Sequence, residues 1–223
     1  MGDKKRLFIG VQLALATTRK VGDAIEVMRR GAPDKGLRAV WVPPPNLHLT
    51  LKFLGWVRAD AVAAIGDALA QRAPGNRPFD VQARGVGAFP NERAARVLWV
   101  GAQDPSGSLA KLVAEVEDDM AALGFPREER AFSPHLTIGR VKEGKGAEEV
   151  LAPYHAADFG RSTIRELILF ESVTKSTGSV YMPLARATLG VAAAGTERQT
   201  RVLEPAADIN SEEPEGHGGQ QPA

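Results

Sequence analysis

The sequence predicts an α+β protein built from antiparallel sheets. Segments in which apolar and polar residues alternate, as in half-buried strands, are mixed with segments of helical spacing, and they lack the regular strand–helix–strand rhythm of a parallel sheet. The second observation is internal repetition. The frame His-Leu-Thr occurs at His48–Thr50 and again at His135–Thr137, 87 positions later, which is too far for one hairpin. We therefore expect two similar halves, each with one motif strand.

The first half alternates predicted strands with two amphipathic helices. Strands are expected at residues 7–13, 39–42 and 47–54, and helices at 17–30 and 60–72. Val21, Ile25 and Met28 form the apolar stripe of the first helix, and a threonine at its start should cap it. The prolines at 43–45 exclude a helix and should lead an extended chain into the first motif strand.

The rest of the chain continues this mixture, and the echo of the first half begins at Phe132. Strands are expected at residues 79–89, 96–100, 135–141, 164–173 and 180–189, and helices at 106–123 and 148–154. Gly124 should end the longest helix. From Gly190 the chain is rich in Ala, Gly, Glu, Gln and Pro, so we expect one folded domain over residues 1–189 and a disordered acidic tail over 190–223.

Composition limits the class of protein. The chain has 223 residues, of which 43% are hydrophobic, and no cysteine, so it forms neither disulfides nor a thiolate metal site. A cysteine-free chain fits a reducing compartment, and we expect a cytoplasmic protein. No stretch approaches the roughly 18 apolar residues of a membrane span. The tail carries a net charge of −4 and the whole chain +1, so residues 1–189 carry +5. That basic body suits a phosphate-bearing partner, although many other proteins are equally basic.

The two motifs indicate proton transfer. Side chains two positions apart on a strand share a face, so His48 should lie beside Thr50, and His135 beside Thr137. Paired imidazoles can accept one proton and donate another near neutral pH. A single strand histidine is more often structural, and it is the pairing that gives the motif its weight.

The surroundings of both motifs resemble a known family, the RNA 2′,3′-cyclic phosphodiesterases, also called 2′–5′ RNA ligases, of the two-histidine phosphoesterase superfamily. The stretch VPPPNLHLTLKFLG at 42–55 is similar to the family's first motif, and FSPHLTIGR at 132–140 to its second. Residues 6–11 resemble the opening strand, and Ser172, Gly178 and Tyr181 fit the closing hairpin. The resemblance covers about residues 6–186.

The resemblance implies a bilobal fold, in which two antiparallel sheets with helices outside face each other across a central cleft. It further implies metal-free hydrolysis of 2′,3′-cyclic phosphate ends of RNA or oligonucleotides, with His135 as proton acceptor and His48 as donor. Thr50 and Thr137 would bind the non-bridging phosphate oxygens, and Arg140 would clamp the phosphate. We expect no cofactor, no membrane partner and a monomer.

Other interpretations remain open. The same site could join a 2′,3′-cyclic end to a 5′-hydroxyl, could cleave 2′–5′-linked oligonucleotides or a small cyclic nucleotide, or could bind nucleotides without turnover. A catalytic zinc is disfavoured because the usual ligand motifs are missing. The other histidines, His155 and His217, have no motif around them. Five aromatic residues close to the predicted cleft strands could stack on a base, but each is more simply a core residue: Phe8, Trp41, Phe53, Phe132 and Tyr181.

Overall fold

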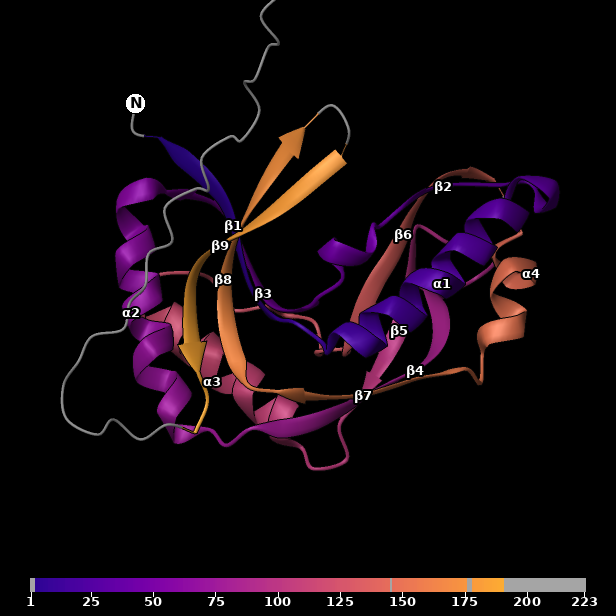
Figure 1. Ribbon diagram of the computed structural model, residues 1–223. Coiled ribbons are helices and arrows are strands. Elements are labelled where there is room, and N and C mark those ends of the chain that lie inside the picture. The colour runs from indigo at the N-terminus through magenta and orange to yellow at the C-terminus, as the bar shows by residue number, and fades with distance from the viewer. Residues whose placement is uncertain (1–2, 145, 176–177, 191–223) are drawn as a thin grey trace, which may run out of the picture.

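A strongly curved antiparallel sheet dominates the computed structural model, which describes residues 3–144, 146–175 and 178–190 (Figure 1). Its nine strands are β1 (Lys4–Val11), β2 (Leu37–Trp41), β3 (Leu49–Arg58), β4 (Phe79–Phe89), β5 (Val97–Gln103), β6 (His135–Gly144), β7 (Asp158–Ile164), β8 (Glu166–Lys175) and β9 (Gly178–Thr188). They follow the order β7-β4-β5-β6-β3-β1-β8-β9, and β2 also pairs with β6. The predicted α+β class is confirmed.

The sheet consists of two lobes that meet at one residue pair. Leu49 of β3 lies opposite Leu136 of β6, and both side chains are fully buried. Strands β3, β1, β8 and β9 form the first lobe, and β6, β5, β4 and β7, with β2, form the second. The two sheets expected from the sequence are thus halves of one continuous sheet, and within the described residues β3 and β6 pair only at these leucines.

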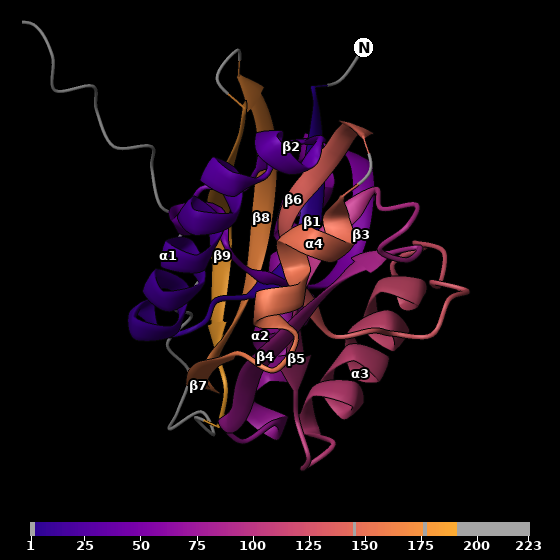
Figure 2. The same ribbon diagram turned by 90° about the vertical axis from the view of Figure 1, so that its right-hand side faces the viewer.

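Helices cover the outer face of each lobe. α1 (Leu15–Gly31) and α4 (Ala147–Leu151) lie on the second lobe, whereas α2 (Val62–Arg72) and α3 (Ser108–Ala122) lie on the first (Figures 1 and 2). Each buries an apolar stripe; in α3 this stripe includes Leu109, Leu112 and Val116. None of the helices in the described ranges is long and apolar enough to cross a membrane.

The structure differs from the sequence-based expectations in several details. α1 begins at Leu15 without a side-chain cap, so the predicted threonine cap was wrong. The prolines form a 3₁₀ turn over Pro44–Asn46 rather than an extended lead, since the fixed proline φ also suits the start of a helical turn. The sequence reading missed β7. The predicted tail begins at Gly190, the last described residue, and otherwise lies outside the described residues.

Candidate active site

The first motif forms a local hydrogen-bonded unit at the start of β3. The Nδ1 of His48 lies 2.7 Å from the backbone oxygen of Asn46, and its Nε2 lies 2.9 Å from Oγ1 of Thr50. The contact with a carbonyl oxygen means that Nδ1 carries a hydrogen, so Nε2 is the nitrogen that can exchange a proton. His48 and Thr50 share a strand face, as predicted.

The second motif repeats the first contact. The Nδ1 of His135 lies 2.7 Å from the backbone oxygen of Ser133, again two residues earlier in the chain. Its Nε2 therefore also faces away from the backbone. Thr137 follows on the same face of β6, opposite Trp99 of β5. The two halves thus orient their imidazoles by the same device.

The pairing of Leu49 with Leu136 brings the motifs together. Both leucines point into the core, so the residues beside them point to the opposite, concave face. In this antiparallel arrangement His48 and Thr137 flank the leucine pair on one side, and Thr50 and His135 flank it on the other. The four predicted side chains therefore gather where the lobes join.

Arg140 reaches the same face because β6 is bulged. Thr137 pairs with Trp99 but Gly139 pairs with Leu98, so one extra residue, Ile138, sits in β6. In a regular strand, Arg140 would point to the core face. The extra residue shifts the alternation by one, so Arg140 points to the same face as His135 and Thr137. The side chain is exposed and forms no ion pair within the described residues. Its guanidinium is free for an anionic ligand.

β3 carries a bulge at the equivalent position. Thr50 pairs with Gly10 and Lys52 with Ile9, so the extra residue directly follows the threonine, as in β6. The bulge turns Lys52 into the core, where its Nζ lies 2.6 Å from Oε2 of Glu117. Phe53 comes to the concave face instead, five residues after His48, just as Arg140 is five residues after His135. The two lobes therefore present different groups at equivalent positions, an aromatic ring and a cation.

Aromatic rings surround the His48 side chain. Its ring centroid lies 4.7 Å from Phe8, 4.9 Å from Tyr181 and 5.9 Å from Phe170. This burial lowers the pKa of His48, the Asn46 carbonyl oxygen partly offsets that effect, and the charge of nearby His135 lowers the pKa further. In the unliganded protein the His48 imidazole is therefore held toward its neutral form.

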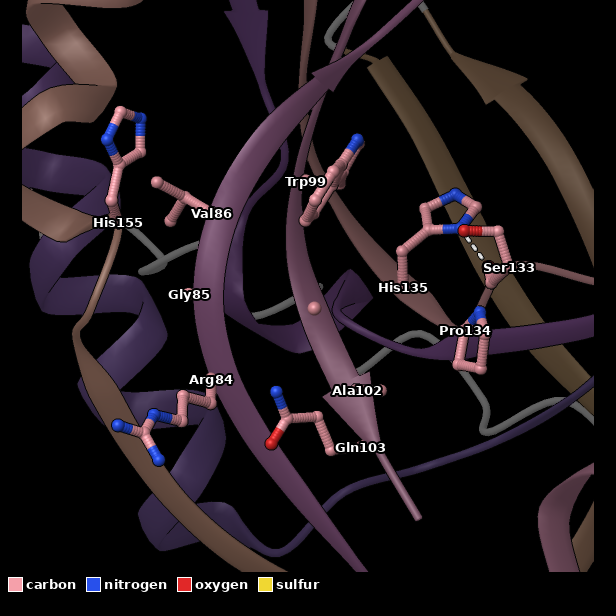
Figure 3. A pocket seen from close by; sticks show the side chains of 11 residues that line it. Arg84, Gly85, Val86, Trp99, Ala102, Gln103, Ser133, Pro134, His135 and His155 are labelled. Atoms are coloured by element: carbon pink, nitrogen blue, oxygen red, sulfur yellow. Dashed lines mark hydrogen bonds between the residues drawn. The ribbon is translucent and has the colours of Figure 1, made fainter. Parts of the chain in front are cut away.

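A pocket of about 340 Å³ adjoins His135 on the second lobe (Figure 3). His135, Ser133 and Trp99 border one end, and Arg84 and His155 the other. His155, which had no motif in the sequence, contacts Oε1 of Glu92 at 2.9 Å. The sequence reading missed this pocket because its lining comes from β4, β5 and the segment before β6, which only the sheet topology brings together.

The aromatic candidates separate into two groups. Phe8 and Tyr181 contact His48, and Phe53 is 63% exposed on the concave face. Trp41 and Phe132 are partly buried and pack against the core, as expected of structural aromatic residues. His217 lies outside the described residues. Within the described ranges, no three His, Cys, Asp or Glu side chains cluster as metal ligands would.

Sequence comparison identifies similar proteins. A family model described as LigT like phosphoesterase matches residues 15–99 and again residues 100–181. The RNA 2′,3′-cyclic phosphodiesterase of Aquifex aeolicus is 31% identical over 189 residues, which cover 83% of this chain and 97% of the relative. That of Archaeoglobus fulgidus is 33% identical over 180 residues, covering 80% and 97%. The two successive matches of one family model agree with a duplicated fold.

Structural comparison gives the same relationship. Escherichia coli LigT complexed with 3′-AMP superposes with a TM-score of 0.67 at 25% identity, covering 84% of this chain and 99% of that chain. TT0787 of Thermus thermophilus has a TM-score of 0.67 at 27% identity, covering 83% and 98%. The whole described fold, rather than one lobe, is shared with these proteins.

Proposed function

Since the chain belongs to the LigT-like phosphoesterase family, we propose that it hydrolyses RNA ends bearing a 2′,3′-cyclic phosphate to 2′-phosphates, using two histidines and no metal. The observation that carries the proposal is the gathering of His48 and His135 at the joint between the lobes, each with Nδ1 bound to a backbone oxygen. The names of the relatives, RNA 2′,3′-cyclic phosphodiesterases, supply the substrate class.

The reaction requires one proton to be removed and one to be delivered. His135 Nε2 accepts a proton from water as the water oxygen bonds to phosphorus. The bond from phosphorus to O3′ breaks, and His48 Nε2 donates its proton to that oxygen. The product keeps the phosphate on O2′. Each histidine ends in the protonation state opposite to its starting one, so an exchange with solvent resets the pair.

Three side chains are positioned to hold the phosphate. The hydroxyl groups of Thr50 and Thr137 can donate to the non-bridging oxygens, where charge accumulates in the transition state. The exposed Arg140 adds a planar cation that can bind two oxygens at once. Because the bulge in β6 is what brings Arg140 to this face, the backbone irregularity is part of the binding site.

The lowered pKa of His48 is compatible with a donor role once substrate binds. Burial favours the neutral imidazole in the free protein. The negative charge of a bound cyclic phosphate favours the imidazolium, and a His135 that starts neutral, as a base must, does not repel it. The Thr50 hydroxyl can then accept the Nε2 hydrogen until it is transferred.

The test is turnover of an oligonucleotide ending in a 2′,3′-cyclic phosphate after exhaustive treatment with a chelator. We expect a 2′-phosphate product, and we expect His48→Ala and His135→Ala each to lose about 10²–10⁴-fold in kcat. Circular dichroism should show that both variants fold. Turnover that appears only when metal is restored, or a variant that keeps full rate, would contradict the proposal.

Ligation is the second candidate, and the pocket beside His135 is the observation that favours it. The proposed base adjoins a space of about 340 Å³, which can hold far more than one water molecule. An alcohol from a second RNA could therefore take the place of water and form a 2′–5′ bond. Supplying a 5′-hydroxyl oligonucleotide with the cyclic-ended one, and measuring joined against hydrolysed product, separates the two reactions.

A further inference from the structure

Two large aromatic side chains stand exposed on the concave face of the first lobe. Phe53 and Trp56 of β3 are 63% and 69% exposed. Phe53 pairs with Phe8, and Trp56 pairs with Arg6. Between them the register shifts again: Leu54 is the extra residue, and Gly55 after it has a φ of 74°, which suits a glycine. This second bulge keeps Trp56 on the same face as Phe53, since Arg6 and Phe8 lie two residues apart on β1.

This face is continuous with the candidate active site. The Phe8 ring lies 4.7 Å from the His48 ring and 6.0 Å from the Phe53 ring, measured between centroids. A molecule bound at His48 can therefore extend along β3, past Phe53, to Trp56. Leu15 and Val27, which are exposed to a similar degree, lie instead on α1, on the outside of the second lobe.

The far end of the face is positively charged. Arg6 lies directly opposite Trp56, is exposed, and forms no ion pair within the described residues. Lys4, two residues earlier and on the same face, is also exposed. Asp60 already binds Arg58, and the exposed Asp3, next to Lys4, forms no ion pair with Lys4 or Arg6 within the described residues. An aromatic ring next to unpaired cations suits a nucleobase with its phosphate better than an apolar protein surface.

We propose that Trp56 and Arg6 form a subsite for a second nucleotide of single-stranded RNA. This nucleotide is the neighbour of the terminal nucleotide, whose cyclic phosphate is held at the histidines. This inference rests on the proposed function and narrows its substrate to RNA ends in which the second nucleotide from the cyclic phosphate is unpaired. The base stacks on Trp56 and the phosphate contacts Arg6.

Strand geometry sets the form of the bound RNA. Two to three steps of about 3.3 Å separate Phe53 from Trp56, or roughly 7–10 Å. This exceeds the spacing of about 3.4 Å between stacked bases in one strand. With the terminal base against Phe53 and the second base on Trp56, the two bases cannot stack on each other, so the RNA must be unpaired and extended at this end. A base-paired end should therefore be a poor substrate.

The test compares substrates of different length. We measure kcat/KM for a mononucleoside 2′,3′-cyclic phosphate and for a trinucleotide with the same end, in the wild type, Trp56→Ala and Trp56→Phe. The ratio of trinucleotide to mononucleotide should fall about tenfold or more in Trp56→Ala and be largely retained in Trp56→Phe, because phenylalanine still stacks. Val27→Ala, which removes a 60% exposed side chain from α1, is the control and should leave the ratio unchanged.

Binding gives an independent readout. A trinucleotide 2′-phosphate should quench tryptophan fluorescence in the wild type, and most of that quench should be absent in Trp56→Phe. An unchanged length ratio together with an unchanged quench would overturn the subsite. So would a concentration-dependent dimer that Trp56→Ala dissolves, since a second copy of the chain would then cover this face. Absence of turnover with both substrates would refute the proposed function instead, and the quench would still decide the subsite.

Discussion

Replacing Lys52 by methionine should cost stability rather than substrate affinity. Strict alternation after His48 and Thr50 would place Lys52 on the concave face as a third phosphate contact. The bulge in β3 instead turns it inward, where its side chain is 3% exposed and that of its partner Glu117 is 13% exposed. The lysine also donates to the backbone oxygen of Pro126, 2.8 Å away, in the segment that leads to β6.

The magnitude follows from this burial. Removing one member of a buried ion pair leaves the other uncompensated, which costs about 3–5 kcal/mol. For a domain of this size that loss corresponds to a fall in Tm of roughly 10 °C. Replacing both partners, as in Lys52→Met with Glu117→Met, should recover most of the loss, because apolar side chains can fill the space of a buried ion pair.

Urea unfolding of the wild type, both single variants and the double variant measures the coupling between the two positions. KM for a cyclic-ended oligonucleotide is measured on the same samples. If Lys52→Met unfolded like the wild type but bound substrate more weakly, Lys52 would face the cleft. The bulge in β3, and with it the placement of Phe53 on the concave face, would then be wrong.

Three further predictions concern the site itself. Burial and the charge of His135 lower the pKa of His48 below its ordinary value of about 6.5. Because the free enzyme must hold the donor proton, kcat/KM should fall as pH rises through that lowered pKa. A kcat/KM profile that is flat between about pH 5 and 8 would exclude His48 as the donor. Arg140→Ala should lower kcat/KM about 10- to 100-fold through lost charge-assisted hydrogen bonds, and Arg140→Lys should restore only part, as steady-state kinetics can show. Gly10→Ala should reduce both Tm and activity, because the new Cβ would lie 2.8 Å from the backbone oxygen of Leu49 and 3.6 Å from the His48 ring. A fully active variant with an unchanged Tm would show that the backbone around Gly10 can accommodate a methyl group.

The sequence predicted those features that depend on local pattern. The alternation around His48 and His135 gave the shared face with each threonine, and the apolar stripe and terminal glycine of residues 106–123 gave a helix close to α3. β4 was predicted with its observed limits. In these segments the burial of one face is enough to determine the secondary structure.

Features that depend on pairing between distant segments escaped the sequence. The bulges in β3 and β6 come from their register with β1 and β5, and no residue pattern within the motifs predicts them. β7 was missed because its buried Ser162 interrupts the apolar alternation; the hydroxyl bonds to Thr17 of α1 instead. Trp56 reads as an ordinary strand residue until the structure shows that its ring is exposed beside Arg6.

The assignment of His48 as proton donor and His135 as proton acceptor is tested most directly with a substrate whose leaving oxygen, O3′, is replaced by sulfur. A thiol has a pKa of about 8.5, so a thiolate can leave without receiving a proton. We expect that His48→Ala, slow on the oxygen substrate, recovers most of the wild-type rate on the sulfur substrate, whereas His135→Ala stays slow on both because water must still be deprotonated. Recovery of His135→Ala instead, or equal recovery of both variants, would contradict the assignment of His48 as the proton donor.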